Sequence, residues 1–189
     1  DLAEGIRVDA AGQAFLEGVA QSDENSFPVN GGPDETFNGE TDCFVAKIRA
    51  QPDDRQPARN MVYAGYIGGA DHDIGVFDIP GTADVFVTAG HIALDEAGNL
   101  YVSGMTRSRQ DSFPDGDGFG SLRGPDRSFG GFWDAFVAKV KPDGKSLAWA
   151  GYAGGNGEEH GNGIGVDRAG AVYFSGQTNS PPLSLGVKL

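Results

Sequence analysis

The chain has almost no cysteine, little positive charge and no long apolar run. Its 189 residues include one cysteine, Cys43, which permits neither an internal disulfide nor a thiolate metal cage; we expect Cys43 to be a small buried side chain. No stretch approaches the roughly 20 apolar residues that span a bilayer. The first residues, DLAEGIRVDAAG, also lack the basic start and apolar run of a signal peptide. We therefore expect no membrane insertion.

Positive charge is scarce relative to negative charge. Lys and Arg number 14 against 27 Asp and Glu, giving a formal net charge of -13. Such a chain repels phosphate backbones and anionic membranes, so nucleic acid is not an expected partner. The acidic surface is compatible with divalent cations, with high salt or simply with solubility.

What the sequence does contain is a set of repeated modules. Its 31 glycines and 10 prolines favour many short strands joined by turns over long helices. Three modules recur in the same order, and they keep their length while the joints between them vary, which indicates loops of differing size on a fixed framework. The copies are GIRVDAAGQAFLEG (5–18), HIALDEAGNLYVSG (91–104) and GIGVDRAGAVYFSG (163–176); DCFVAKI (42–48) and DAFVAKV (134–140); VYAGYIGG (62–69) and AWAGYAGG (148–155).

Each module has the residues of β-strands. Its β-branched and aromatic residues alternate approximately with a period of two, which predicts strands near 5–9, 13–18, 43–48, 61–67, 91–95, 99–104, 135–140, 147–153, 163–167 and 171–176. The first two strands of each repeat are joined by Asp-x-x-Gly, in which Asp can accept from local amides and Gly can take a positive φ. These structural turns are Asp9 with Gly12, Asp95 with Gly98, and Asp167 with Gly170.

Four antiparallel strands that recur with a long period predict an all-β fold built of β-propeller blades. About two and a half blades are present, too few to close a ring, so we expect an incomplete propeller whose open sides are covered by further blades, by another protein or by a second copy. Because the chain opens inside a repeat, we also expect it to be part of a longer precursor. The predicted division is blade 1 over 1–69, an inserted joint with an additional hairpin over 70–90, blade 2 over 91–155, and the first half of blade 3 over 156–189.

The modules also resemble a known family, the bacterial β-propeller repeat called SBBP. Its pattern is similar to HIALDEAGNLYVSGMTRSRQDSFP (91–114) followed by DAFVAKVKPDG (134–144) and AGYAGG (150–155). The first repeat departs from the pattern, with EGVAQS (17–22) where the family has a TGxTxS motif. The resemblance implies a secreted, extracellular or cell-envelope bacterial protein, generally without an assigned activity.

The most specific candidate binding site is FPDGDGFGS (113–121), where Asp115 and Asp117 alternate with glycines as oxygen ligands in a calcium loop often do. The match is partial, since a third ligand and the Glu at the twelfth place of an EF-hand are lacking. We predict Asp115 and Asp117 as the metal ligands if calcium is bound; the alternative is a solvated Gly-Asp loop. No other cofactor is expected.

A second group of acids follows the double glycine of the third module, in GGADHD (68–73) and GGNGEEH (154–160). Asp73 and Glu159 are equivalent, and each lies near a histidine, so metal binding or acid-base catalysis is conceivable there. A single active site, however, would not require acids at every joint. Loop capping is therefore the favoured role.

No catalytic motif occurs, and we predict that the chain is not an enzyme. The expected function is a structural or interaction module in which long loops on one face bind a protein partner or a surface. Two alternatives stay open, a carbohydrate-active propeller enzyme and a calcium-stabilised adhesion repeat. Self-association is possible in each case.

Overall fold

The computed structural model of the chain describes residues 1–51, 53, 55, 56, 59–73, 76–78, 85–87 and 91–181, the segments 76–78 and 85–87 by their backbone alone. The fold is all-β and every strand pairing is antiparallel. Within the described residues, no helix is long and apolar enough to cross a membrane.

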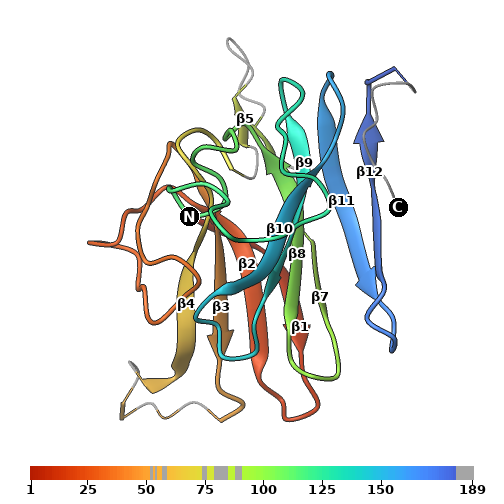
Figure 1. Cartoon of the computed structure of the whole chain (residues 1–189). Helices are drawn as coiled ribbons and strands as arrows, with labels where there is room; N and C mark the ends of the chain where they lie inside the picture. Colours follow the sequence, from red (N-terminus) through yellow and green to blue (C-terminus); the bar gives the residue numbers. More distant parts are fainter. Residues whose placement is uncertain are drawn as a thin grey trace.

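The first two sheets have four strands each, and neighbours in sequence are neighbours in the sheet (Figure 1). The first sheet contains β1 (Leu2–Val8), β2 (Ala14–Ala20), β3 (Asp42–Ile48) and β4 (Met61–Ile67). The second contains β7 (His91–Leu94), β8 (Leu100–Thr106), β9 (Asp134–Val140) and β10 (Leu147–Ala153). All eight strands lie on segments that the modules predict, because each module buries its alternating apolar residues.

The remaining strands form two hairpins. The third sheet pairs β11 (Glu159–Val166) with β12 (Val172–Thr178). β11 begins four residues before the predicted 163, because Glu159–Gly161 continue the pairing beyond a register shift between Gly161 and Gly163. The inserted joint contains β5 (Val76–Asp78) and β6 (Val85–Val87).

The sheets stack face to face in sequence order. β7 packs beside β1 and β2, and β11 packs beside β7, β8 and β9. We call the side of a sheet that faces the preceding sheet in this order its leading face, and the opposite side its trailing face. The main core lies between the trailing face of the first sheet and the leading face of the second, and includes Phe15, Val45, Tyr63, Ile92, Val102, Phe136 and Ala138.

The Asp-x-x-Gly turns have the backbone that the sequence requires. Gly12, Gly98 and Gly170 have φ of 79°, 83° and 85°, a region that costs glycine little. The carboxylates of Asp9, Asp95 and Asp167 accept hydrogen bonds from backbone amides two to four residues ahead. With the β3–β4 and β9–β10 connections, these turns lie at the lower end of the sheets in Figure 1.

The long loop between strands two and three of each four-stranded sheet protects the outer edge of strand four. The amide of Tyr66 donates to the carbonyl of Asp34 at 2.8 Å, and the amide of Tyr152 donates to that of Asp126 at 2.9 Å. Both acceptors belong to a Gly-Pro-Asp segment, 32–34 and 124–126, a repeat that the sequence analysis missed. Covering these edges removes a template for aggregation.

Candidate functional site

The joints between sheets contain the most unusual chemistry of the molecule, which is a set of buried carboxyl groups. Asp73 lies six residues after β4, and Glu159 is the first residue of β11. Their exposed fractions are 0% and 3%. Carboxylates are almost never this buried unless they are paired or hydrogen-bonded.

Each joint acid accepts hydrogen bonds from the same three places. The Asp73 carboxylate accepts from the amide of Gly69 at 2.7 Å, from the hydroxyl of Ser108 at 2.6 Å, and from the hydroxyl of Thr106. The Glu159 carboxylate accepts from the amide of Gly155 at 2.8 Å and from the hydroxyls of Thr178 at 2.7 Å and Ser180 at 2.5 Å. The acid therefore ties the end of one sheet to strand two of the next.

This arrangement gives the Thr-x-Ser pattern its physical role. Thr106 and Thr178 are the last residues of β8 and β12. Ser108 and Ser180 lie two residues further on, so both hydroxyls of each pair meet the acid of the preceding joint. The first repeat has Ala20 in place of the Thr, and there the side chain of Asp1 accepts instead from the amides of Gln21 and Ser22, at 2.9 and 3.0 Å.

A second buried acid lies beside each joint acid, and the sequence analysis did not single it out. Asp42 and Asp134 begin the equivalent strands β3 and β9 and are 0% and 1% exposed. A Cβ built on Gly154 would lie 2.8 Å from Oδ1 of Asp134 and 2.7 Å from Oε2 of Glu159, so these two carboxyl groups converge on one glycine. The signal for the pair was present in the sequence, because Asp precedes the FVAK segment in both copies of the second module.

Burial controls the ionisation of these groups. Desolvation raises the pKa of Asp42 to about 8, against a lowering contribution from the amide of Asn38 and with the nearby Asp73 as a further raising influence. Desolvation also raises the pKa of Asp73 to about 7, although its three hydrogen bonds oppose the shift. Desolvation likewise raises the pKa of Asp134, to about 6.

Glu17 is the most exceptional of the buried acids. It lies on β2 at the position occupied by Ser103 and Ser175 in the other repeats, is 0% exposed, and neither carboxyl oxygen has a hydrogen-bond partner. Desolvation first, and then the charge of Glu4, raise its pKa to about 8. Cys43 is free and buried, as a small core residue should be, and desolvation followed by the charges of Glu17 and Asp42 raises its pKa.

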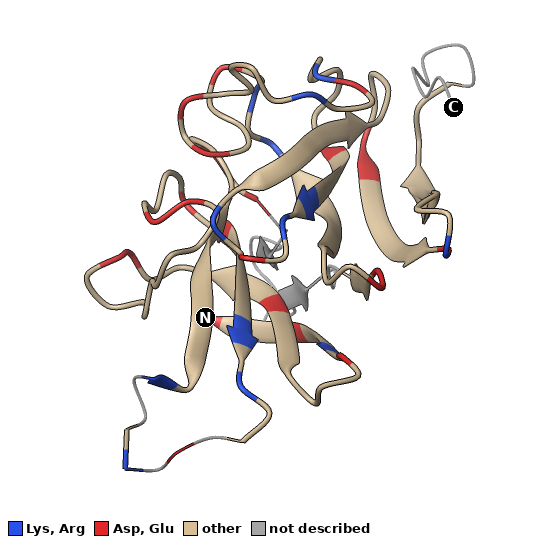
Figure 2. Ribbon diagram, turned by 60° about the horizontal axis from the view of Figure 1, so that its bottom comes forward, with Lys and Arg blue, Asp and Glu red and all other residues tan. Residues whose placement is uncertain are grey.

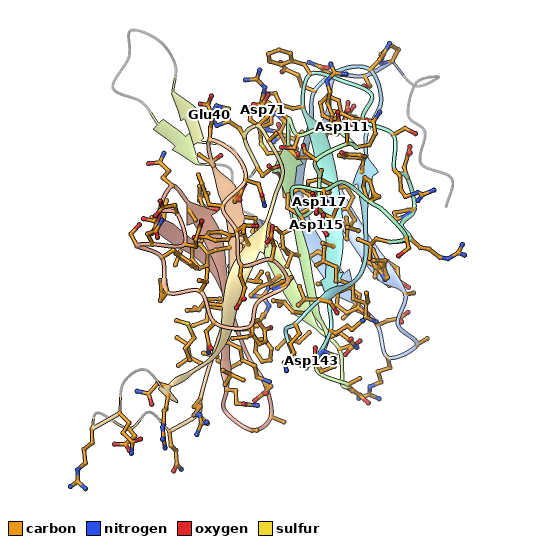
Figure 3. The ribbon with its side chains drawn as sticks, turned by 60° about the vertical axis from the view of Figure 1, so that its left-hand side comes forward. Glu40, Asp71, Asp111, Asp115, Asp117 and Asp143 are labelled. Atoms are coloured by element: carbon orange, nitrogen blue, oxygen red, sulfur yellow. The ribbon has the colours of Figure 1, made fainter. Side chains whose placement is uncertain are left out.

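The predicted calcium ligands lie elsewhere, on the β8–β9 loop. Asp115 and Asp117, labelled in Figure 3, are both exposed. The glycines after them, Gly116 and Gly118, have φ of 82° and 78°. Desolvation raises the pKa of Asp115. No group of three or more His, Cys, Asp or Glu that could hold a metal ion occurs in the described part of the chain, so calcium binding here stays a prediction that rests on two carboxylates.

The histidine of the first joint, His72, contacts an exposed acid and a hydroxyl group. His72 is partly buried, and its Nε2 lies 3.3 Å from Glu40 and its Nδ1 3.3 Å from the hydroxyl of Thr41. Glycoside cleavage requires two carboxyl groups about 5 to 10 Å apart in an open cleft. Asp134 and Glu159 are close together, but they are enclosed in the joint.

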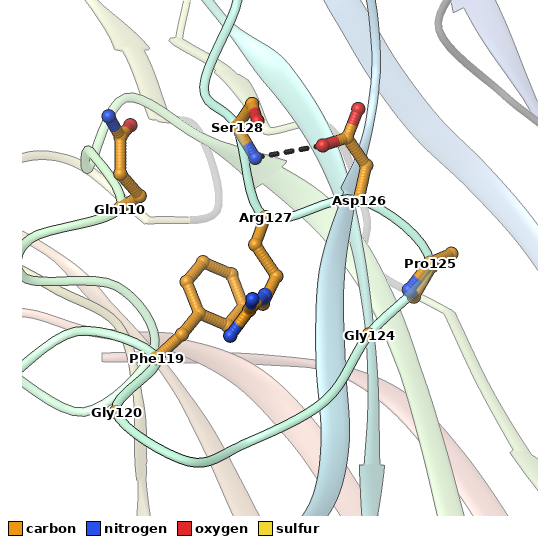
Figure 4. A pocket seen from close by; sticks show the side chains of 8 residues that line it. All are labelled: Gln110, Phe119, Gly120, Gly124, Pro125, Asp126, Arg127 and Ser128. Carbon is orange, nitrogen blue, oxygen red and sulfur yellow. Dashed lines mark hydrogen bonds between the residues drawn. The ribbon is translucent and has the colours of Figure 1, made fainter.

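A shallow pocket of about 440 Å³ lies against the same long loop of the second sheet (Figure 4). It is lined by Gln110, Phe119 and the segment from Gly124 to Ser128. The Asp126 carboxylate accepts a hydrogen bond from the amide of Ser128 at 2.8 Å. None of the residues that line this pocket is a buried acid of the joints. The pocket and the carboxyl pairs are therefore separate features.

The chain was compared with known proteins. It matches no model of a protein family, and no curated protein is significantly similar to it.

Proposed function

We propose that the chain is a non-catalytic structural and interaction module of a secreted or cell-envelope bacterial β-propeller repeat protein. The blade interpretation is supported by the order β1-β2-β3-β4 and its counterpart β7 to β10, and by the packing of β7 beside β1 and of β11 beside β7. Simple up-and-down sheets that pack face to face around their first strands are typical of propellers. The resemblance of the modules to the SBBP repeat points the same way.

One observation carries the non-catalytic part of the proposal. The carboxylates of Asp73 and Glu159 are buried, and both are engaged by one amide and two hydroxyl donors at equivalent positions of two joints. A catalytic carboxyl group needs access to a substrate and is required once. Two enclosed, fully engaged copies instead serve the connection between sheets.

The long loops are the surface that we assign to the partner. Apart from the buried Asp73 and Glu159, the segments 19–41, 70–73, 105–133 and 156–162 contain eleven Asp and Glu but only four Arg and no Lys. Figure 2 shows acidic positions along these loops. An acidic surface favours a partner of opposite charge and accelerates their encounter. We propose that the partner presents a cationic surface.

Binding of a lysine-rich model peptide, measured by calorimetry at increasing salt, tests this proposal. The variant Glu40→Gln/Asp111→Asn/Asp117→Asn removes three charges from the long loops, each worth about 0.5 kcal/mol at an exposed site. Together they should raise Kd about tenfold. Added salt should weaken the binding of the unmodified chain, because it screens exposed charges.

The matched control removes three acids from the opposite end, in Asp53→Asn/Glu96→Gln/Asp143→Asn. Figure 3 shows Asp143 far from the cluster of Glu40, Asp71 and Asp111. This control should change Kd by less than about twofold, since the charges lie beyond a Debye length from the bound peptide. Equal losses in both variants, or no binding at low salt, would contradict a role of the long loops.

A further inference from the structure

The two ends of the row of sheets carry exposed apolar residues at positions whose equivalents are buried elsewhere in the chain. The first sheet's own long loop covers the β3–β4 side of its leading face, so the exposed part of that face lies on β1. On the leading face of the first sheet, Ile6 and Val8 of β1 are 56% and 60% exposed. The strand pairings place Ile6 opposite Leu16, as Ile92 is opposite Val102 in the second sheet. Ile92, the equivalent of Ile6, is only 1% exposed because it packs against the first sheet.

The trailing face of the third sheet also exposes a residue whose equivalents are buried in the other sheets. Tyr173 of β12 is 64% exposed, whereas its equivalents Tyr101 and Phe15 are 1% and 0% exposed. These two aromatic rings are covered where another sheet follows their own. A Cβ on Gly165, the residue opposite Tyr173, would meet no atom within 4 Å.

Inside the chain, a trailing face is therefore covered by a leading face. The first junction buries Phe15 of the first sheet in one core with Ile92 of the second. At the second junction, where β11 packs beside β7 and β8, Tyr101 of the second sheet is buried, and Ile164 and Phe174 on the leading face of the third sheet are partly buried. At the two ends of the row, one surface of each kind stays exposed. The first sheet exposes the β1 part of its leading face, and the third sheet exposes its trailing face.

We infer that the leading face of the first sheet binds the trailing face of the third sheet in a second copy of this chain. The contact would repeat the junction that the chain makes twice internally, with Ile6 and Val8 packing beside Tyr173 as Ile92 and Leu94 pack beside the first sheet. Because the two surfaces differ, the association is head-to-tail. It uses the sheet faces and does not depend on the loop-mediated binding proposed above.

Sedimentation equilibrium of the whole chain tests this inference, over about 1 to about 100 µM, the range in which small interfaces become occupied. We expect the average mass to rise with concentration. The variants Ile6→Asp/Val8→Asp and Tyr173→Asp each place charge on one face, and each should weaken association at least tenfold. Phe132→Asp is the matched control, since Phe132 is 58% exposed on a long loop and should leave association unchanged.

Mixing the two defective variants separates loss of docking from loss of folding. Ile6→Asp/Val8→Asp keeps an intact trailing face and Tyr173→Asp keeps an intact leading face, so the mixture should form heterodimers although neither variant associates alone. A chain that stays monomeric over the whole range, association that neither variant weakens, or a mixture that stays monomeric would overturn the inference.

Discussion

The hydroxyl of Tyr152 donates a hydrogen bond to the backbone carbonyl of Ser108 at 2.9 Å, and thereby connects strand four of the second sheet to the segment that follows its strand two. The first sheet contains the same bond, from Tyr66 to Ser22, also at 2.9 Å. Ser108 in turn donates to Asp73. One residue thus links the outer strand of a sheet to the buried acid at its joint.

Removal of this bond should destabilise the chain. Tyr152→Phe deletes a buried hydroxyl and leaves the carbonyl of Ser108 without it, so we expect the free energy of unfolding to fall by about 1 kcal/mol. Urea denaturation measures the change. Tyr173→Phe is the control, because the hydroxyl of Tyr173 binds Asp167 at an exposed site and its loss should have little effect. Equal losses would show that burial of the bond is unimportant.

The turn glycines should not tolerate a side chain. Gly98 has φ of 83°, and a Cβ there would lie 3.7 Å from the nearest atom, in Pro142. Since space is present, the cost of Gly98→Val comes from the backbone, and we expect about 1 kcal/mol or more. Gly165→Ala, where φ is not positive and no atom is near, should be close to neutral. A neutral Gly98→Val would contradict the turn assignment.

Stability should decline as pH rises from about 4 to about 8. Burial raises the pKa of Glu17 and Asp42 to about 8 and that of Asp73 to about 7. Over this interval the unfolded chain loses these protons while the folded chain keeps them, so the free energy of unfolding falls. The opposite trend belongs below pH 4, because hydrogen bonds from Gln13 and Ala171 lower the pKa of Asp9 and Asp167, respectively.

Glu17→Gln isolates the contribution of one group to that decline. The charged group that acts on Glu17 is Glu4, and the variant leaves it in place. The decline between pH 5 and 8 should become shallower by up to about 1.4 kcal/mol per pH unit, the effect of one proton. Chemical denaturation at four or five pH values gives the slopes. An unchanged slope would show that Glu17 is ionised in the folded chain.

Calcium binding by Asp115 and Asp117 has a direct thermal test. A cation that binds only the folded chain must raise the melting temperature, and the increase should disappear with chelator and in Asp115→Asn/Asp117→Asn. The turn-end variant Asp143→Asn should keep the increase. A melting temperature that millimolar calcium does not change would remove the predicted site.

The strands could be predicted from the sequence because the information is local. Alternation of apolar residues within seven-residue segments located every strand of the three stacked sheets, and the β5–β6 hairpin lies in the segment where an additional pair was expected. β1 and β11 begin earlier than predicted, at Leu2 and Glu159. In both strands the pairing continues beyond a register shift, toward the preceding joint. Such irregularities depend on the partner strand, which the local pattern does not contain.

The buried acid pairs could be predicted only in part. The sequence shows that Asp73 and Glu159 recur, and that the first repeat has Ala20 where the others have the Thr of Thr-x-Ser. It does not show that the hydroxyls bind the acids, because Thr106 and Asp73 are 33 residues apart in the chain. Asp42 and Asp134 resembled ordinary strand ends. Glu17 occupies a position that is serine in the other repeats, and this difference was a usable signal that the analysis did not weigh.

The account depends most on the structural role of the joint acids, and the stability of Asp73→Ala tests it. The substitution leaves the amide of Gly69 and the hydroxyls of Thr106 and Ser108 buried without their acceptor, and each unpaired donor costs about 1 to 3 kcal/mol. We predict that urea denaturation shows a loss of at least about 2 kcal/mol at pH 6. Asp71→Ala, a partly exposed neighbour that contacts Arg107 at 3.6 Å, should lose less than about 1 kcal/mol. An Asp73→Ala chain as stable as the unmodified one, or more stable, would contradict the account, because residues kept for function rather than structure are the ones whose replacement costs no stability.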